Sequence, residues 1–133
     1  MKIDHIGIAV ESIEKVAQFY KDLNLDICHT EEVKDQQVKA AMIEIGESRI
    51  ELLESLSPEG PIGKFIAKKG PSIHHIAVEV KNLEEKLKEL EQKGYSLIDK
   101  TPRIGAGGNK IAFIHPKSSG GILIELCEKC SNE

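Results

Sequence analysis

The sequence is poor in features that mark several large classes of protein. It has no tryptophan, its aromatic content is 4%, and no run approaches the roughly 18 apolar residues that span a bilayer. Eighteen Lys and Arg against 22 Asp and Glu give 18 − 22 = −4, so a basic face that neutralises nucleic-acid phosphates is not expected. We therefore expect a globular protein that binds neither nucleic acid nor a membrane.

Signals for secretion and for disulfide bonding are also weak. The first ten residues lack the charged, apolar and cleavage regions of a signal peptide, which predicts a cytoplasmic protein. Cys28, Cys127 and Cys130 are an odd set, so reduced thiols are expected. Cys127 and Cys130 form a C-x-x-C motif, but a zinc site would need a second pair and a redox motif would lie at a helix start. We interpret these cysteines as small buried apolar residues.

What the sequence does contain is an internal repeat. Two pairs of segments match, 4–10 with 74–80 and 49–54 with 123–128. The first match aligns His5 with His75 at an offset of 75 − 5 = 70. The second aligns Glu51 with Glu125 at an offset of 125 − 51 = 74, so four residues of insertion separate the copies. We therefore expect two similar modules within one domain, 1–133.

Each copy predicts one strand, one helix and three further strands. The first copy gives about 3–10, 12–23, 26–33, 37–45 and 49–55, and the second about 74–80, 82–93, 95–100, 109–115 and 121–127. Ser12 and Asn82 are the expected helix caps, with Glu85 placed to close a capping box and Gly94 to stop the second helix. The fold class predicted is α+β, built from two tandem βαβββ modules.

The modules are expected at about 1–56 and 72–133. A linker at about 57–71, rich in proline and glycine, is expected to hold one short helix packed on the surface. A half of about 65 residues buries too small a core to be stable on its own. We therefore expect the two modules to pair about a pseudo-two-fold axis, forming a cupped, open barrel-like mixed sheet around a metal site.

Four charged residues stand inside apolar strands at the matching positions, namely His5, Glu51, His75 and Glu125. Each alone is readily explained as a satisfied core histidine or a solvent-facing glutamate. A buried charge is costly unless it is paired or bound to a metal, and the recurrence in both copies favours a site. Two imidazoles and two carboxylates suit a borderline or hard divalent ion such as cobalt, nickel, manganese or zinc.

The other three histidines are not predicted to be metal ligands. His74 is adjacent to His75 but on the opposite face of the strand, and the alignment of Asp4-His5 with His74-His75 selects His75. His29 and His115 have no counterpart in the other copy, so we interpret them as surface or loop residues.

Several motifs together resemble the methylmalonyl-CoA epimerase family of the vicinal-oxygen-chelate superfamily. They are D-H-I-x-I-A-V at 4–10, I-E-L-L-E at 50–54, H-H-I-A-V-E-V at 74–80, G-A-G-G at 105–108, H-P-K at 115–117 and G-G-x-L-x-E-L at 120–126. The paired modules and four ligands are shared with lactoylglutathione lyase. The last three motifs make the epimerase family the closer match.

This resemblance implies a specific chemistry. It implies a cobalt-type divalent metal on the four ligands, a homodimer, an acyl-CoA substrate, and inversion of methylmalonyl-CoA at C2. Removing the proton beside a thioester and a carboxylate gives an enolate, whose charge a divalent cation could stabilise. Inversion then needs an acid/base group on each face of the substrate. We expect Glu125 to be both a metal ligand and one of these groups, since burial can raise a carboxyl pKa towards neutrality.

One position departs from the family pattern. A second catalytic glutamate is often found on the third strand of the first module, where this sequence has Ala40. If Ile45 pairs with Ile50, Glu44 lies opposite Glu51, since 45 + 50 = 44 + 51. We expect Glu44, or an ordered water, to take this role. A turn of odd length would instead point Glu44 to solvent.

The coenzyme A end and the reaction leave alternatives open. Lys117, Gly107 and Gly108 are candidates to approach the pantetheine or its phosphates, although a plain hairpin explains the same residues. A thiol-dependent lyase resembling lactoylglutathione lyase would use the same metal and ligands. A non-catalytic protein that sequesters a small molecule could have the same fold, but it has no need of four metal ligands.

Overall fold

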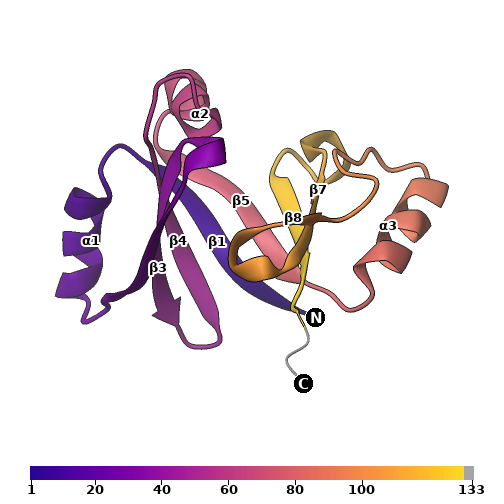
Figure 1. The fold of residues 1–133 in the computed structure, drawn as a ribbon, viewed down its shortest axis with the longest axis horizontal. Coiled ribbons are helices and arrows are strands. Elements are labelled where there is room, and N and C mark those ends of the chain that lie inside the picture. The colour runs from indigo at the N-terminus through magenta and orange to yellow at the C-terminus, as the bar shows by residue number, and fades with distance from the viewer. Residues whose placement is uncertain (131–133) are drawn as a thin grey trace. The chain divides into compact units, whose positions relative to one another are not determined.

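The structure, a computed structural model, describes residues 1–130, shown in Figure 1. They belong to two compact units that are described separately. Unit 1 comprises Met1–Asp4 and the chain from His75 onward, and unit 2 comprises His5–His74. Within residues 1–130, no helix combines the length and the apolar character needed to cross a membrane.

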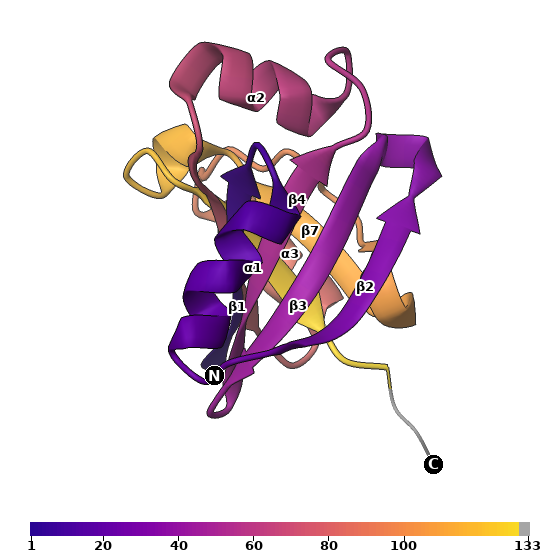
Figure 2. The same ribbon diagram turned by 90° about the vertical axis from the view of Figure 1, so that its left-hand side faces the viewer.

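Unit 2 holds the first βαβββ module and one further helix. Its elements are β1 (Lys2–Val10) from His5 onward, α1 (Ile13–Asp22), β2 (Ile27–Val33), the short 3-10 turn η1 (Lys34–Gln36), β3 (Val38–Ile45), β4 (Ser48–Ser55), α2 (Pro61–Lys69) and the first three residues of the strand that follows. The strands lie in the order β2-β3-β4-β1. β1 is parallel to β4, and the other neighbours are antiparallel. Figure 2 shows β4, β3 and β2 side by side, with α1 near the viewer and α2 at one end of the strands.

The two faces of this sheet are covered by different helices. Side chains alternate along a strand, so Ile43 and Leu52 lie on one face, where they pack with Ile13 at the start of α1. Ala40 lies on the other face, in a cluster with Ile62 of α2. The predicted linker helix is therefore confirmed, but it contributes a buried side chain to the core of unit 2 rather than resting only on the surface.

Unit 1 holds the second module. Its elements are β5 (Ser72–Glu79), α3 (Leu83–Gln92), β6 (Arg103–Ile104), η2 (Ala106–Gly108), β7 (Lys110–Ile114), η3 (Pro116–Ser118) and β8 (Leu123–Glu128). The strands lie in the order β5-β8-β7-β6, with β5 parallel to β8. The core of unit 1 is formed where Leu83 and Leu87 of α3 pack with Ala112 and Leu126 of the sheet.

The strand predicted at 95–100 is wrong. Only Leu97 forms a bridge there, with Ile114. The carbonyl of Phe113 instead accepts hydrogen bonds from the backbone N–H groups of Ile98 and Asp99, at 3.0 and 3.2 Å. The edge of the sheet is taken by β6, which has two residues.

In both units, a glutamate side chain on the last strand of the module accepts a hydrogen bond from the first residue of the first helix. Glu54 accepts a hydrogen bond at 2.7 Å from the N–H of Ile13, and Glu128 accepts one at 3.2 Å from the N–H of Leu83. These N–H groups have no partner within their helices. Ser12 also caps α1, as predicted. Asn82 takes the predicted N-cap position of α3, but its side chain makes no capping hydrogen bond and its backbone is left-handed, with φ of 53°.

Candidate functional site

The first histidine–glutamate pair lies within unit 2. β1 and β4 run parallel, with His5 beside Arg49 and Gly7 beside Glu51, so His5 and Glu51 share one face of the sheet. His5 Nε2 lies 3.6 Å from Glu51 Oε1. Both residues are buried, with exposed fractions of 7% and 8%. We call the face of unit 2 that carries this pair its ligand face.

The second pair lies within unit 1 and repeats this arrangement. β5 and β8 run parallel, with His75 beside Leu123 and Ala77 beside Glu125. His75 Nε2 lies 3.6 Å from Glu125 Oε1, the same separation as in unit 2. His75 and Glu125 are buried to a similar degree, with exposed fractions of 5% and 7%.

The donor atoms of each pair fit a divalent metal ion. Within residues 1–130, the buried polar or charged side chains are these four and Asp4, and Asp4 is paired with Lys129 at 2.6 Å. The separation of 3.6 Å in each pair is longer than a normal hydrogen bond. Two ligand atoms that each lie about 2.1 Å from one ion are separated by roughly 3–3.5 Å. Each pair therefore offers one nitrogen and one oxygen at a spacing suited to adjacent ligands.

The other histidines have different surroundings. His74 packs edge-on against Phe65 of α2, with ring centroids 4.9 Å apart, which agrees with the choice of His75 as the partner of Glu125. His115 is exposed, as expected, and its Nδ1 accepts a hydrogen bond from a backbone N–H in η3. His29 is exposed but lies within β2, and its Nε2 is 3.6 Å from Glu31 Oε1.

The predicted pairing of Glu44 with Glu51 is wrong. Met42 lies opposite Glu51, and Glu44 lies opposite Arg49. The difference arises because Ile45 pairs with Ser48, which leaves a hairpin loop of two residues. The shift is an even number of residues, so Glu44 still lies on the ligand face of unit 2, but it is exposed near the hairpin.

Ala40 also lies on the ligand face of unit 2, two residues before Met42 on β3. It lies opposite Leu53 on β4 and is 5% exposed. Its neighbours in the core cluster include Ala9 and Ile62, so its surroundings on this side are apolar. The position where the family often has a glutamate therefore holds a small buried side chain.

Phe113 and Arg103 border the pair of unit 1, and the sequence did not single them out. Phe113 lies opposite Glu125 on β7, and its ring is perpendicular to that of His75, with centroids 6.2 Å apart. The guanidinium of Arg103 lies 5.1 Å from the Phe113 ring centroid. Asp99 holds both residues: it accepts a hydrogen bond at 2.8 Å from the N–H of Phe113 and lies 3.5 Å from Arg103 Nε. Neither position has a counterpart in the repeated motifs, so no repeat signal marked it.

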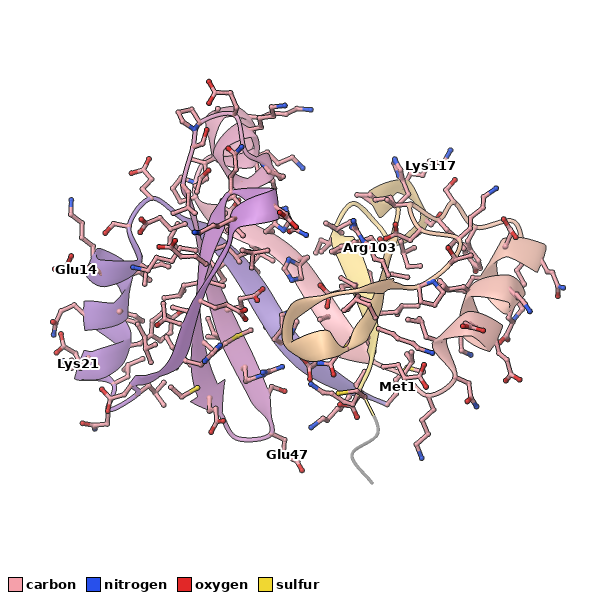
Figure 3. All side chains as sticks on the ribbon, in the orientation of Figure 1. Met1, Glu14, Lys21, Glu47, Arg103 and Lys117 are labelled. Carbon is pink, nitrogen blue, oxygen red and sulfur yellow. The ribbon has the colours of Figure 1, made fainter. Side chains whose placement is uncertain are left out.

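The residues predicted to contact coenzyme A lie in turns of unit 1. Lys117 is exposed in η3, and Figure 3 labels it together with Arg103. Gly107 and Gly108 have left-handed backbones, with φ of 72° and 79°, which glycine adopts most readily. These conformations suit a tight turn and also allow close backbone approach by a ligand.

The C-x-x-C motif does not present two thiols to one site. Cys127 is buried, as expected, and burial raises the pKa of its thiol to about 12. Cys130 is exposed, with its Sγ 4.0 Å from the carbonyl oxygen of Gly107. Cys28 is also exposed, so the expectation of burial is wrong for these two cysteines.

Comparison with known proteins gives a consistent family. Residues 4–113 match the model of the Glyoxalase/Bleomycin resistance protein/Dioxygenase superfamily. An uncharacterised protein of Bacillus subtilis is 44% identical over 128 residues, covering 96% of this chain and 91% of its own length. The mitochondrial methylmalonyl-CoA epimerase of Homo sapiens is 34% identical over 127 residues, covering 94% of this chain and 72% of its own length.

A solved structure extends this similarity to the fold. A methylmalonyl-CoA epimerase in complex with methylmalonyl-CoA and NH4+ has 34% sequence identity and a TM-score of 0.90, covering 99% of this chain and 96% of that chain. The predicted fold class and the predicted enzyme class, an epimerase, are confirmed by these relatives. The chain therefore belongs to the methylmalonyl-CoA epimerase family of the Glyoxalase/Bleomycin resistance protein/Dioxygenase superfamily.

Proposed function

We propose that this protein epimerises methylmalonyl-CoA at C2. The observation that carries the proposal is a buried histidine–glutamate pair in each module, at equivalent positions of the repeat and with the same 3.6 Å separation. The human relative bears the name of this activity, and the solved relative was bound to this acyl-CoA. A protein without chemistry would have no reason to bury two such pairs at a cost in desolvation.

The proposal includes one divalent metal ion held by His5, Glu51, His75 and Glu125. Two imidazole nitrogens and two carboxylate oxygens suit cobalt, our first choice, and also nickel, manganese or zinc. When bound, such an ion supplies electrostatic stabilisation of the negative charge that develops on the substrate oxygens.

The proton at C2 is the centre of the reaction. Its removal leaves an electron pair that the neighbouring thioester delocalises as an enolate, and return of a proton on the opposite face inverts the carbon. We assign one of these transfers to the Glu125 carboxylate, which is buried and lies opposite the Phe113 ring on the adjacent strand. Exclusion of water strengthens the electrostatic effect of groups in such a site. Glu44 stays our sequence-based prediction for the second transfer.

Further parts of the proposal concern the substrate tail and the assembly. Lys117, Gly107 and Gly108 contact the coenzyme A moiety, and the protein works as a cytoplasmic homodimer. Pairing of subunits would cover sheet edges and apolar surface, as is usual for soluble oligomers. Sedimentation at micromolar concentration should give a dimer, and a monomer alone would contradict this part of the proposal.

The activity is tested by isotope entry. The purified protein, loaded separately with cobalt, nickel, manganese or zinc, is incubated in D2O with each stereoisomer of methylmalonyl-CoA. We expect deuterium at C2 and formation of the other stereoisomer from both starting compounds. Absence of exchange with every metal would overturn the proposed function. Conversion of a hemithioacetal by the same preparations would then support the thiol-dependent lyase, and purification without any bound metal would support the sequestering protein.

A further inference from the structure

The edge strand of unit 2 carries a second histidine–glutamate pair. The position of this pair follows from the pairing of β2 with β3 and of β3 with β4. His29 lies opposite Met42, which in turn lies opposite Glu51, and Glu31 lies opposite Ala40. Residues directly opposite in an antiparallel pair project to the same face. His29 and Glu31 therefore share the ligand face of unit 2.

The packing of β2 confirms this orientation independently. Val33, two residues beyond Glu31, packs against the core cluster that contains Ala40. Because side chains alternate along a strand, residues 29, 31 and 33 must lie on one face. The assignment thus rests on a buried contact as well as on backbone register.

A bulge in β2 decides which residues face this way. Ile27 pairs with Ile43 and His29 pairs with Met42, so Cys28 is an extra residue in β2. Its Sγ donates to the carbonyl oxygen of Met42 at 3.3 Å. A bulge re-aims the side chains that follow it. Without it, Thr30 rather than Glu31 would stand opposite Ala40.

The environment of Glu31 suits proton transfer. Its side chain is 35% exposed, whereas that of His29 is 61% exposed, and the two lie 3.6 Å apart between Nε2 and Oε1. Ala40, which lies opposite Glu31, has a small apolar side chain. The imidazole thus lies beside the carboxylate and in contact with solvent, where it can pass a proton in either direction.

We propose, on the basis of the proposed epimerase function, that Glu31 is the second acid/base group of the reaction and that His29 links it to solvent. In one direction the Glu31 carboxylate takes the C2 proton, and the C–H electron pair enters the enolate. A protonated Glu125 then delivers its proton to the opposite face of C2. Glu31 afterwards releases its proton through His29 to water, and Glu125 takes one from water, which restores the starting state.

Glu31 is a better candidate than Glu44 because of its position on the sheet. It lies opposite Ala40, the position of the missing family glutamate, whereas Glu44 lies opposite Arg49 on the other side of the Met42–Glu51 pair.

The test compares three glutamine variants in the metal-loaded protein. Glu31→Gln removes the proposed base, Glu44→Gln removes the sequence-based candidate, and Glu32→Gln is a matched control on the same strand but the opposite face. Each is assayed in D2O with both stereoisomers, and deuterium entry is measured separately from inversion. We expect Glu31→Gln to lower inversion roughly 10²–10⁴-fold, the usual contribution of general acid–base catalysis. One stereoisomer should still exchange its C2 proton through Glu125 without inverting.

This separation of exchange from inversion distinguishes a lost base from a structural defect, which would slow both together. Formate should partly restore inversion in Glu31→Ala, because it supplies a carboxylate, and His29→Gln should slow inversion about tenfold. The inference is overturned if Glu31→Gln inverts both stereoisomers at the parent rate, or if only Glu44→Gln separates exchange from inversion. An inactive parent protein contradicts the proposed function itself.

Discussion

The ligand pairs of the two units are alike, but the residues around them are not. Each pair joins a histidine on the first strand of its module to a glutamate on the last, at 3.6 Å. In unit 2 the glutamate lies opposite Met42, and the edge strand β2 has seven residues. In unit 1 the glutamate lies opposite Phe113, and the edge strand β6 has only two residues.

This difference shows which parts of a duplicated module are constrained by a shared task. The proposed ligation requires particular atoms at particular separations, which would explain why the central strands β1, β4, β5 and β8 keep equivalent residues. The edge strands contribute no residue to the proposed ligand set, and they have diverged. β2 carries an exposed His29 paired with Glu31, whereas β6 carries Arg103 stacked on an aromatic ring. The chemistry that differs between the two faces of a substrate can therefore be supplied by the edges.

The largest effects should come from removing a ligand of either pair. His5→Ala and His75→Ala should each lower metal affinity more than about 100-fold, since even the partners of metal ligands usually contribute 10–100-fold. Activity should fall in parallel while the fold is retained. Metal analysis after dialysis and circular dichroism measure the two quantities. Full metal occupancy in one variant would show that the two units are not equivalent.

Substitution of Glu125 and of Glu51 should affect turnover differently, whereas the two histidine substitutions should have similar effects. Glu125→Gln should lower turnover roughly 10²–10⁴-fold at saturating metal while substrate binding stays measurable, because it removes a proton-transfer group. Glu51→Gln should mainly weaken metal retention, and excess metal should recover much of its turnover. Steady-state kinetics across a metal titration checks this contrast. Equal losses of turnover at saturating metal would contradict the assignment of proton transfer to Glu125.

The helix-capping glutamates should give smaller, purely structural effects. Glu54→Ala and Glu128→Ala each remove an acceptor for a helical N–H, and we expect each to lower the free energy of unfolding by about 1–2 kcal/mol. The bond of Glu54 is the shorter, at 2.7 Å against 3.2 Å, so its loss should cost more. Urea denaturation measures both. A greater loss for Glu128→Ala would show that Ser12 compensates in α1.

The smallest effect is expected at the exposed face of α3. Lys86 and Lys93 hold the pKa of the Glu89 carboxyl below its ordinary value through hydrogen bonds and charge. A lowered folded pKa gives a stabilising contribution that is present above the unfolded pKa and is lost as pH falls through the folded value. Glu89→Gln should therefore lower the urea midpoint slightly at neutral pH and leave it unchanged in strong acid. High salt should reduce the shift, and a salt-independent shift would contradict it.

The sequence predicted the parts of the molecule that repeat. The aligned strands located the four buried histidine and glutamate side chains, and the choice of His75 over His74 agrees with the packing of His74 against Phe65. The pairing of these residues could be predicted because a polar side chain inside an apolar strand, repeated at matching positions, is costly to bury alone. Their role as metal ligands stays a prediction.

What the sequence did not predict depends on single-residue details of backbone pairing. The hairpin after Ile45 closes with two residues rather than four, which moved Glu44 away from Glu51. His29 is exposed, as predicted, but the bulge at Cys28 leaves no mark in the pattern of polar and apolar residues, so the face on which His29 and Glu31 lie was not predicted. Both features concern register, which long-range contacts determine more strongly than local sequence does.

The spacing between ligand and cap on β4 and β8 has a consequence for folding. Glu51 and Glu54 are three residues apart, as are Glu125 and Glu128, so each strand presents one glutamate to the ligand pair and the other to a helix start. A slip of one residue would turn both glutamates to the wrong faces at once. The misaligned chain would lose its helix cap even before any metal arrives, so correct register of the ligand strand is selected in the apoprotein.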